Sequence, residues 1–164
     1  MIISKLIQGG AVALALILPL TSASASEPVR LNPDEYRFPE RAESTAGTSG
    51  TQGIQTAVLS GDPTRAGLYT ILIRIPPNTR IDPHSHRDDR VATVISGDWS
   101  IGYGAVFDPR ALRRLAPGGF YTEPPGLPHF ARTGRRGAVV SITGFGPTDT
   151  QAASPTRSTE GDNR

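Results

Sequence analysis

The chain has 164 residues, enough for one domain with a hydrophobic core, and its 17 Lys and Arg nearly balance its 15 Asp and Glu. It contains no cysteine, which excludes disulfides, thiolate metal sites and cysteine nucleophiles. No basic cluster with interleaved aromatic residues is present, so we expect no nucleic-acid partner. The 18 glycines and 15 prolines favour a turn-rich β protein.

The first residues have the pattern of a secretory signal peptide, which we predict over residues 1–25. Lys5 supplies the positive charge, residues 11–20 the apolar run, and Ala23–Ala25 a small-residue cleavage site. A transmembrane anchor is disfavoured because the apolar run is too short to span a bilayer. We therefore expect an exported protein, periplasmic or extracellular, that begins near Ser26 and keeps no stable membrane anchor after cleavage.

Three further segments follow the signal peptide. Residues 26–53 are a polar, proline-containing lead that continues into a linker-like stretch without periodicity. Residues 54–146 hold the apolar runs and are predicted to form the single folded domain. Residues 147–164 are polar throughout and are predicted to be a disordered tail.

The predicted domain contains about eight short strands with turn signals every 8–12 residues or so. This pattern is typical of an antiparallel sandwich or barrel, and we predict an all-β fold, a double-sheet jelly roll. Gly97 and Asp98 are predicted to turn a hairpin, and residues 108–115 to form a helical turn or a loop. The strands are expected at 54–59, 68–75, around 84–86, and at 91–96, 99–103, 120–123, 129–132 and 138–143.

Two of the three histidines, His84 and His86, are separated by a single residue. Alternate side chains of an extended strand share a face, so both imidazoles would point the same way and could bind one metal ion. Two nearby histidines on the surface with no ligand would have the same spacing. The third histidine, His129, is therefore needed to decide between these interpretations.

His129 ends a second motif, and the two motifs together resemble those of the cupin family over roughly residues 66–145. The resemblance implies a jelly-roll barrel with a divalent transition metal at its three histidines. The metal would be zinc, copper, iron, nickel or manganese. The resemblance also implies a small-molecule ligand and a possible homodimer. The matching positions are His84-Ser-His86 and Gly97 in the first motif, and Gly118, Pro124, Gly126 and His129 in the second.

Three positions depart from the family pattern. Asn78 stands where the first motif opens with glycine, and Thr133 stands where the second motif closes with asparagine. Arg90 stands where the family has its carboxylate ligand, four residues after His86. A guanidinium only donates hydrogen bonds and stays charged, so Arg90 cannot bind a cation.

The arginine leaves three interpretations of the site. In the first, three histidines alone hold the metal, as in a zinc site of three imidazoles and a water, and Arg90 pairs with an anionic substrate. In the second, a neighbouring carboxylate replaces the missing ligand. In the third, the site is metal-free and Arg90 forms a salt bridge. The candidate carboxylates for the second and third interpretations are Asp88, Asp89 and Glu123.

The first interpretation predicts an exported, metal-binding cupin. If it is an enzyme, the resemblance implies a metal-dependent dioxygenase or isomerase that acts on a small anionic substrate. The alternatives are a non-catalytic cupin that binds or senses a small ligand or a metal, and a degenerate cupin without metal. The sequence alone leaves the choice between enzyme and binding module open.

Overall fold

The computed structural model describes residues 28–40 and 47–153, so the predicted signal peptide lies outside the described residues. Within these ranges the fold is all-β, as predicted, with two short 3-10 helices, η1 (Pro33–Glu35) and η2 (Pro109–Ala111). Neither helix is long and apolar enough to cross a membrane. The strands are β1 (Gln55–Ser60), β2 (Gly67–Ile75), β3 (Arg80–Ser85), β4 (Arg90–Tyr103), β5 (Arg113–Leu115), β6 (Phe120–Glu123), β7 (His129–Gly146) and β8 (Gln151–Ala152).

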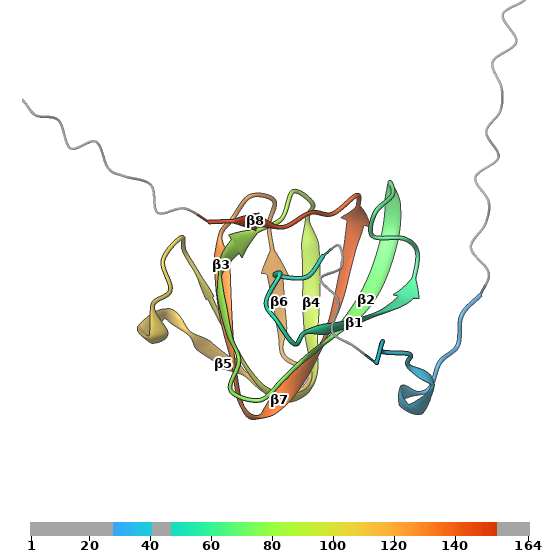
Figure 1. The fold of residues 1–164 in the computed structure, drawn as a ribbon. Coiled ribbons are helices and arrows are strands. Elements are labelled where there is room, and N and C mark those ends of the chain that lie inside the picture. Colours follow the sequence, from blue (N-terminus) through green and yellow to red (C-terminus); the bar gives the residue numbers. More distant parts are fainter. Residues whose placement is uncertain (1–27, 41–46, 154–164) are drawn as a thin grey trace, which may run out of the picture.

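Two long strands, β4 and β7, connect the two sides of the barrel (Figure 1). The strands pair in the order β1-β2-β7-β3-β8, and β4 pairs with β5, β6 and β7. The last half of β7 lies between β2 and the start of β4, while its first half lies between β3 and the end of β4. Each long strand therefore bends from one sheet into the other, which closes a jelly-roll barrel.

The interior of the barrel is filled by alternate residues of its strands. Alternating apolar residues in the sequence predict one buried face on β2, and the residues of this face do point inward and are 7% exposed or less. Trp99 and Val140 add buried side chains from β4 and β7. The β2 residues of this face are Tyr69, Ile71, Ile73 and Ile75.

The predicted hairpin at Gly97 and Asp98 is wrong, because β4 runs through both residues without reversing. Gly97 opposes Ala138 of β7, and Trp99 opposes Thr133. Between these two pairs, β7 has more residues than β4. Gly97 has φ 89°, which a residue without Cβ adopts easily. The glycine therefore marks a bulge that bends the strand across the barrel.

Two departures from the cupin motifs have local explanations. Asn78 has φ 53°, and asparagine is one of the few side chains that tolerate this left-handed conformation. The hydroxyl of Thr133 donates to the carbonyl of Pro76 over 2.7 Å and accepts from the amide of Thr79 over 2.8 Å. Asn78 therefore adopts the turn conformation at the position where the motif has glycine. Thr133 connects two backbone segments at the position where the motif has asparagine.

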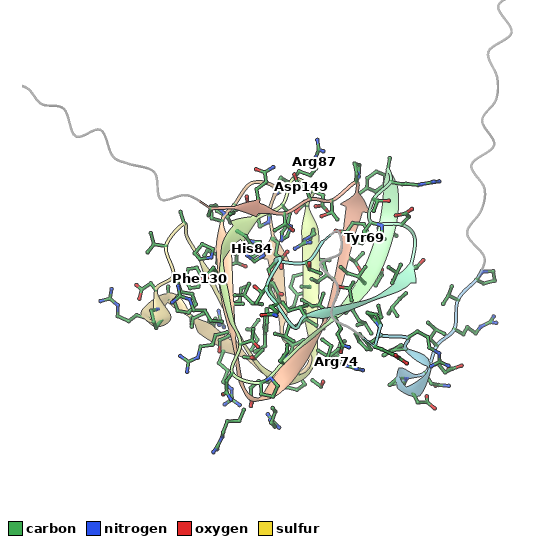
Figure 2. The ribbon with its side chains drawn as sticks, viewed as in Figure 1. Tyr69, Arg74, His84, Arg87, Phe130 and Asp149 are labelled. Atoms are coloured by element: carbon green, nitrogen blue, oxygen red, sulfur yellow. The ribbon has the colours of Figure 1, made fainter. Side chains whose placement is uncertain are left out.

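Part of the predicted disordered tail belongs to the barrel. Residues 147–153 cross its open end, where β8 pairs with β3 through His84 opposite Ala152. Figure 2 shows Asp149 of this segment beside Arg87, whose amide donates to the Asp149 carboxyl over 2.8 Å. Backbone pairing and side-chain hydrogen bonds hold this segment, so its polar composition did not indicate its order. Residues 154–164 lie outside the described residues.

The Tyr69→Phe variant is expected to lower the free energy of unfolding by about 1–3 kcal/mol. The Tyr69 hydroxyl is buried and donates to the Asp88 carboxyl over 2.6 Å, so its removal leaves a buried acceptor short of one partner. Urea unfolding followed by circular dichroism measures the change. The matched control is Tyr103→Phe, because the Tyr103 hydroxyl donates to the Thr122 carbonyl at an exposed position. Equal effects of both variants would contradict the prediction.

Candidate metal centre

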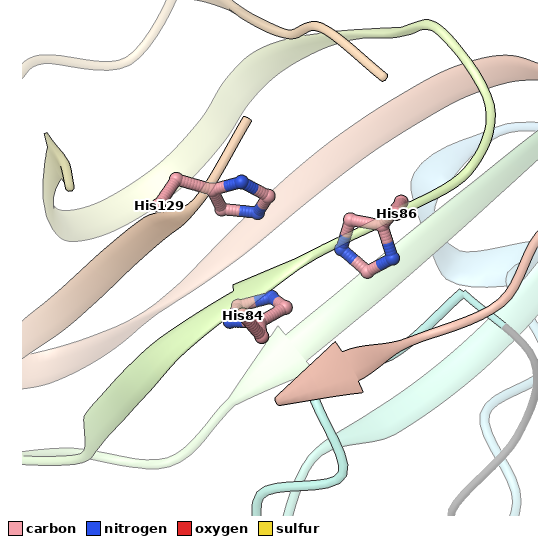
Figure 3. A group of neighbouring side chains, drawn as sticks. All are labelled: His84, His86 and His129. Carbon is pink, nitrogen blue, oxygen red and sulfur yellow. The ribbon is translucent and has the colours of Figure 1, made fainter. Parts of the chain in front are cut away.

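The three histidines meet inside the barrel beside its open end (Figure 3). His84 lies on β3, His86 follows that strand, and His129 opens β7 directly opposite His84. One nitrogen of each ring lies within 4.8 Å of the others, and all three side chains are buried. This is the arrangement of imidazoles that the sequence motifs predicted.

Backbone carbonyls set the orientation of each imidazole. Nδ1 lies 2.8 Å from the Asp82 carbonyl in His84, 2.5 Å from that of Asp149 in His86, and 3.1 Å from that of Leu127 in His129. A carbonyl oxygen can only accept, so each Nδ1 carries the proton and each Nε2 keeps a free lone pair in the neutral ring.

Two of these lone pairs have no partner. Nε2 of His86 and Nε2 of His129 are buried and form no hydrogen bond. Buried polar atoms without a partner are costly and rare in folded proteins, so such atoms point to a missing group. A cation bound between the three rings would satisfy them.

Burial also keeps the histidines neutral. It lowers the pKa of His84 to about 4, with a further contribution from His129, and it lowers the pKa of His86 to about 3, with a contribution from Arg90. Burial lowers the pKa of His129 as well. All three rings are therefore unprotonated at neutral pH, which is the form that binds metals.

Arg90 lies beside the histidines and is 2% exposed. Its Nε donates to Oε2 of Glu123 over 2.7 Å, its Nη2 donates to the same oxygen, and its Nη1 donates to the Gly47 carbonyl over 2.9 Å. The guanidinium is thus engaged by the protein itself. Of the three partners considered for an Arg90 salt bridge in the metal-free interpretation, Glu123 is the one that the structure pairs with it.

The three candidate carboxylates have different places in the structure. Asp88 is buried but accepts from the hydroxyls of Tyr69 and Thr148, away from the histidine group, and Asp89 is exposed. Oε2 of Glu123 lies 3.8 Å from Nε2 of His86 and 3.6 Å from Nε2 of His129. Of these carboxylates, Glu123 alone contacts the site.

Burial by itself would raise the pKa of Glu123. The charge of Arg90, ahead of smaller contributions from His129 and His86, outweighs this effect and lowers the pKa to about 2. Glu123 is therefore a carboxylate at neutral pH. The site thus has three neutral imidazoles and one buried anion.

The loop before β7 links the two motifs. The amide of Gly126 donates to the His86 carbonyl over 2.8 Å, so the segment that leads to His129 is tied to the backbone of His86. Gly126 has φ 70°, as the sequence predicted for a turn residue. This bond fixes the distance between the histidines of the two motifs.

Two cavities adjoin His84. A polar groove of about 670 Å³ reaches it from the surface, between residues 48–51 and the segment that contains Thr150 and Ala152. Inside the barrel, a space of about 20 Å³ has His84, His129 and Glu123 on its wall and is large enough for one water-sized group. His84 therefore lines both the surface groove and the small inner chamber.

The residues present fit a divalent transition metal. Three imidazole nitrogens are a sound donor set for zinc, copper, iron or nickel, and each has a carbonyl on its other nitrogen, as metal-binding histidines commonly do. The orphaned Nε2 atoms are the observation that supports the fit. The residues of the sequence motifs thus form a three-histidine group that could hold such a metal.

Comparison with solved structures identifies the fold. An RmlC-like cupin from Shewanella frigidimarina superposes with a TM-score of 0.53 at 16% identity, over 73% of this chain and 92% of that chain. The polyketide cyclase RemF from Streptomyces resistomycificus gives a TM-score of 0.58 at 15% identity, over 78% and 87% of the two chains. The chain has a cupin fold. The resemblance seen in the sequence motifs is therefore confirmed for the architecture.

Sequence comparison adds a more local relationship. No protein-family model matches the chain. An H2HPP isomerase from Bacillus subtilis is 32% identical over 78 residues, which are 48% of this chain and 31% of that protein. The chain therefore matches about a third of the relative's length, and the relative's activity is a proposal here at most.

Proposed function

We propose that this cupin binds a divalent transition metal through Nε2 of His84, His86 and His129. The observation that carries the proposal is the set of three buried, neutral imidazoles, whose free nitrogens converge and in two cases have no hydrogen-bond partner. The affinity order of divalent ions favours zinc or copper at imidazole ligands, and iron and nickel also suit them.

We further propose that the metal supports catalysis on a small molecule, by a dioxygenase or an isomerase type of reaction. A bound metal supplies a Lewis acid or an oxygen-activating centre. The three histidines would hold the metal, and one of them, His84, lines the polar groove, whose size is typical of small-molecule pockets. The isomerase relative and the cyclase neighbour support an enzymatic function. A non-catalytic metal or ligand sensor is the second candidate, and it would bind without turnover.

Removal of the metal tests the first proposal. Protein purified without chelator is expected to contain about one metal ion per chain by elemental analysis. Treatment with a chelator is expected to lower the melting temperature by several degrees, because a ligand at about 100 times its Kd contributes about 2.7 kcal/mol of stability. Protein that takes up no divalent metal and shows no metal-dependent melting temperature would refute the proposal.

We also propose that the protein is exported, on the basis of the pattern in residues 1–25. Export places metal loading outside the cytoplasm, where zinc and copper compete well. N-terminal sequencing of the protein recovered from the periplasm or the medium is expected to begin near Ser26. Recovery of the full-length chain in the cytoplasm would contradict export.

The outer face of one sheet carries several exposed apolar side chains, with the exposed Arg74 near one end of β2, and it supports pairing with a second copy. Residues directly opposite one another across β2, β7, β4 and β6 share this face, and several of its apolar members are exposed. We propose that two copies pack these faces together. The residues are Leu68, Thr70, Val91, Thr93, Phe120, Thr122, Ser141, Thr143 and Phe145.

A charge on this face is expected to separate the two copies. Light scattering coupled to gel filtration should give the mass of two chains for the unmodified protein and of one chain for Phe145→Glu, because burial of an unpaired charge is costly. Val106→Glu is the matched control: Val106 and Phe145 are both 64% exposed, but Val106 lies outside the four strands. A monomeric unmodified protein would refute the pairing.

A further inference from the structure

We propose that Glu123 supplies the carboxylate ligand that the cupin motif places at position 90, and that Arg90 is the residue that positions it. This inference rests on the proposed metal site and adds a fourth protein donor to it. The carboxylate would come from the neighbouring strand. The position that is acidic in the cupin motif would thus carry the positive charge of Arg90, and its partner on the neighbouring strand the negative charge of Glu123.

The strand register brings the two positions together. Arg90 on β4 and Glu123 on β6 are direct partners in an antiparallel pair. Side chains of such partners lie on the same face with their Cβ atoms about 4.5–5.5 Å apart. A carboxylate on residue 123 therefore starts from the same level and the same side of the barrel as a carboxylate on residue 90 would.

The distances place the Glu123 oxygen beside two of the three histidine nitrogens. Oε2 lies 3.6 Å from Nε2 of His129 and 3.8 Å from Nε2 of His86. In a four-coordinate zinc site with bonds of roughly 2.0–2.1 Å, neighbouring donor atoms lie about 3.4 Å apart. Both nitrogens lack a hydrogen-bond partner, so no proton is shared between them and the carboxylate. The oxygen is thus spaced as a ligand next to His86 and His129, although Glu123 lies outside the group of three nitrogens within 4.8 Å of one another.

Arg90 also binds this oxygen. Its Nε and Nη2 both donate to Oε2, while its Nη1 is anchored to the Gly47 carbonyl. The guanidinium is buried and cannot bind a cation itself. Outer partners of this kind orient metal ligands and change metal affinity by about 10- to 100-fold.

A simpler role for Glu123 is to neutralise the buried charge of Arg90. The two roles differ when both charges are removed together. If Glu123 only balances Arg90, a variant without either charge keeps the metal affinity of the unmodified protein. If Glu123 is a ligand, that variant has lost a donor.

Co²⁺ titration with a competing chelator tests the inference in four variants, with folding of each apoprotein checked by circular dichroism. Glu123→Gln and the double variant Arg90→Gln/Glu123→Gln are both expected to bind Co²⁺ at least about 10-fold more weakly and to change its visible absorption spectrum. The charge swap Arg90→Glu/Glu123→Arg is expected to recover affinity relative to Glu123→Gln. Arg90→Gln alone is expected to retain one Co²⁺ with an altered spectrum, because the carboxylate is no longer held.

Unmodified affinity and spectrum in the double variant, or in Glu123→Gln, would overturn the ligand role of Glu123. An unchanged spectrum in Arg90→Gln would overturn the positioning role of Arg90. These substitutions to glutamine remove charge but little side-chain volume. They therefore remain a decisive test even if the charge-swap variant does not fold. Failure of the unmodified protein to bind Co²⁺ would instead refute the proposed metal site itself.

Discussion

Replacement of His129 by alanine is expected to abolish metal binding, with the content falling from about one ion per chain to background and the affinity falling by at least about 100-fold. His129 is the proposed histidine ligand from the second motif, and its loss leaves the two histidines of the first motif, with or without Glu123. Removal even of an outer partner of a metal ligand costs about 10- to 100-fold, so removal of a ligand costs more. Elemental analysis and chelator competition measure the loss.

Leu127→Ala is the control for this experiment. Leu127 is exposed in the same loop, and the substitution keeps the backbone carbonyl that faces Nδ1 of His129. The control variant should bind metal as the unmodified protein does, and chelator should still lower its melting temperature. Metal that stays in His129→Ala at full content would rule out the three-histidine site.

Replacement of Gly97 by alanine is expected to destabilise the fold by at least about 3 kcal/mol. A Cβ on Gly97 would lie 2.2 Å from the Gly137 carbonyl oxygen and 2.7 Å from the Ala138 Cα, both of which are backbone atoms. The clash would push β4 and β7 apart where both strands change sheets. Urea unfolding measures the difference in the free energy of unfolding.

Gly118→Ala separates the clash from the backbone conformation. Gly118 has φ 84°, close to the 89° of Gly97, but a Cβ there would meet no atom within 4 Å. The control should therefore lose only the conformational part, about 1–2 kcal/mol. Similar losses in the two variants would show that crowding at Gly97 contributes nothing.

The metal site was the part of the protein most open to prediction from sequence. The spacing of His84, His86 and His129 predicted a single metal site, and the three rings do converge. Motif spacing worked because it reflects where each residue falls on a strand and in which turn. The carbonyls that orient the rings could not be predicted, since Asp149 lies in a segment with the composition of a disordered tail.

The role of Glu123 was harder to predict. The sequence left Asp88, Asp89 and Glu123 as candidates to replace the missing carboxylate, and neither aspartate joins the histidine group. Glu123 is 33 residues from Arg90 in the chain, and only the pairing of β4 with β6 makes the two residues neighbours. One feature that could have pointed to Glu123 is its position on a predicted strand within the second motif. The sequence alone does not reveal the strand register that brings it next to Arg90.

Gly97 shows a second limit of the same kind. Apolar runs on both sides of Gly97-Asp98 have the pattern of a hairpin, because a turn and a bulge use the same residues. The difference depends on whether the strand finds a partner that continues past the glycine. Here β7 continues, so β4 bends instead of reversing.

The sequence by itself determined the all-β class, the apolar face of β2, the cupin motifs and the three histidines, because these depend on local periodicity and spacing. The tertiary structure decided that β4 is continuous, that residues 147–153 cover the open end, and that Arg90 is paired with Glu123. Each of these depends on contacts between distant segments. Such contacts are set by strand register and backbone hydrogen bonding, which many sequences satisfy with different side chains.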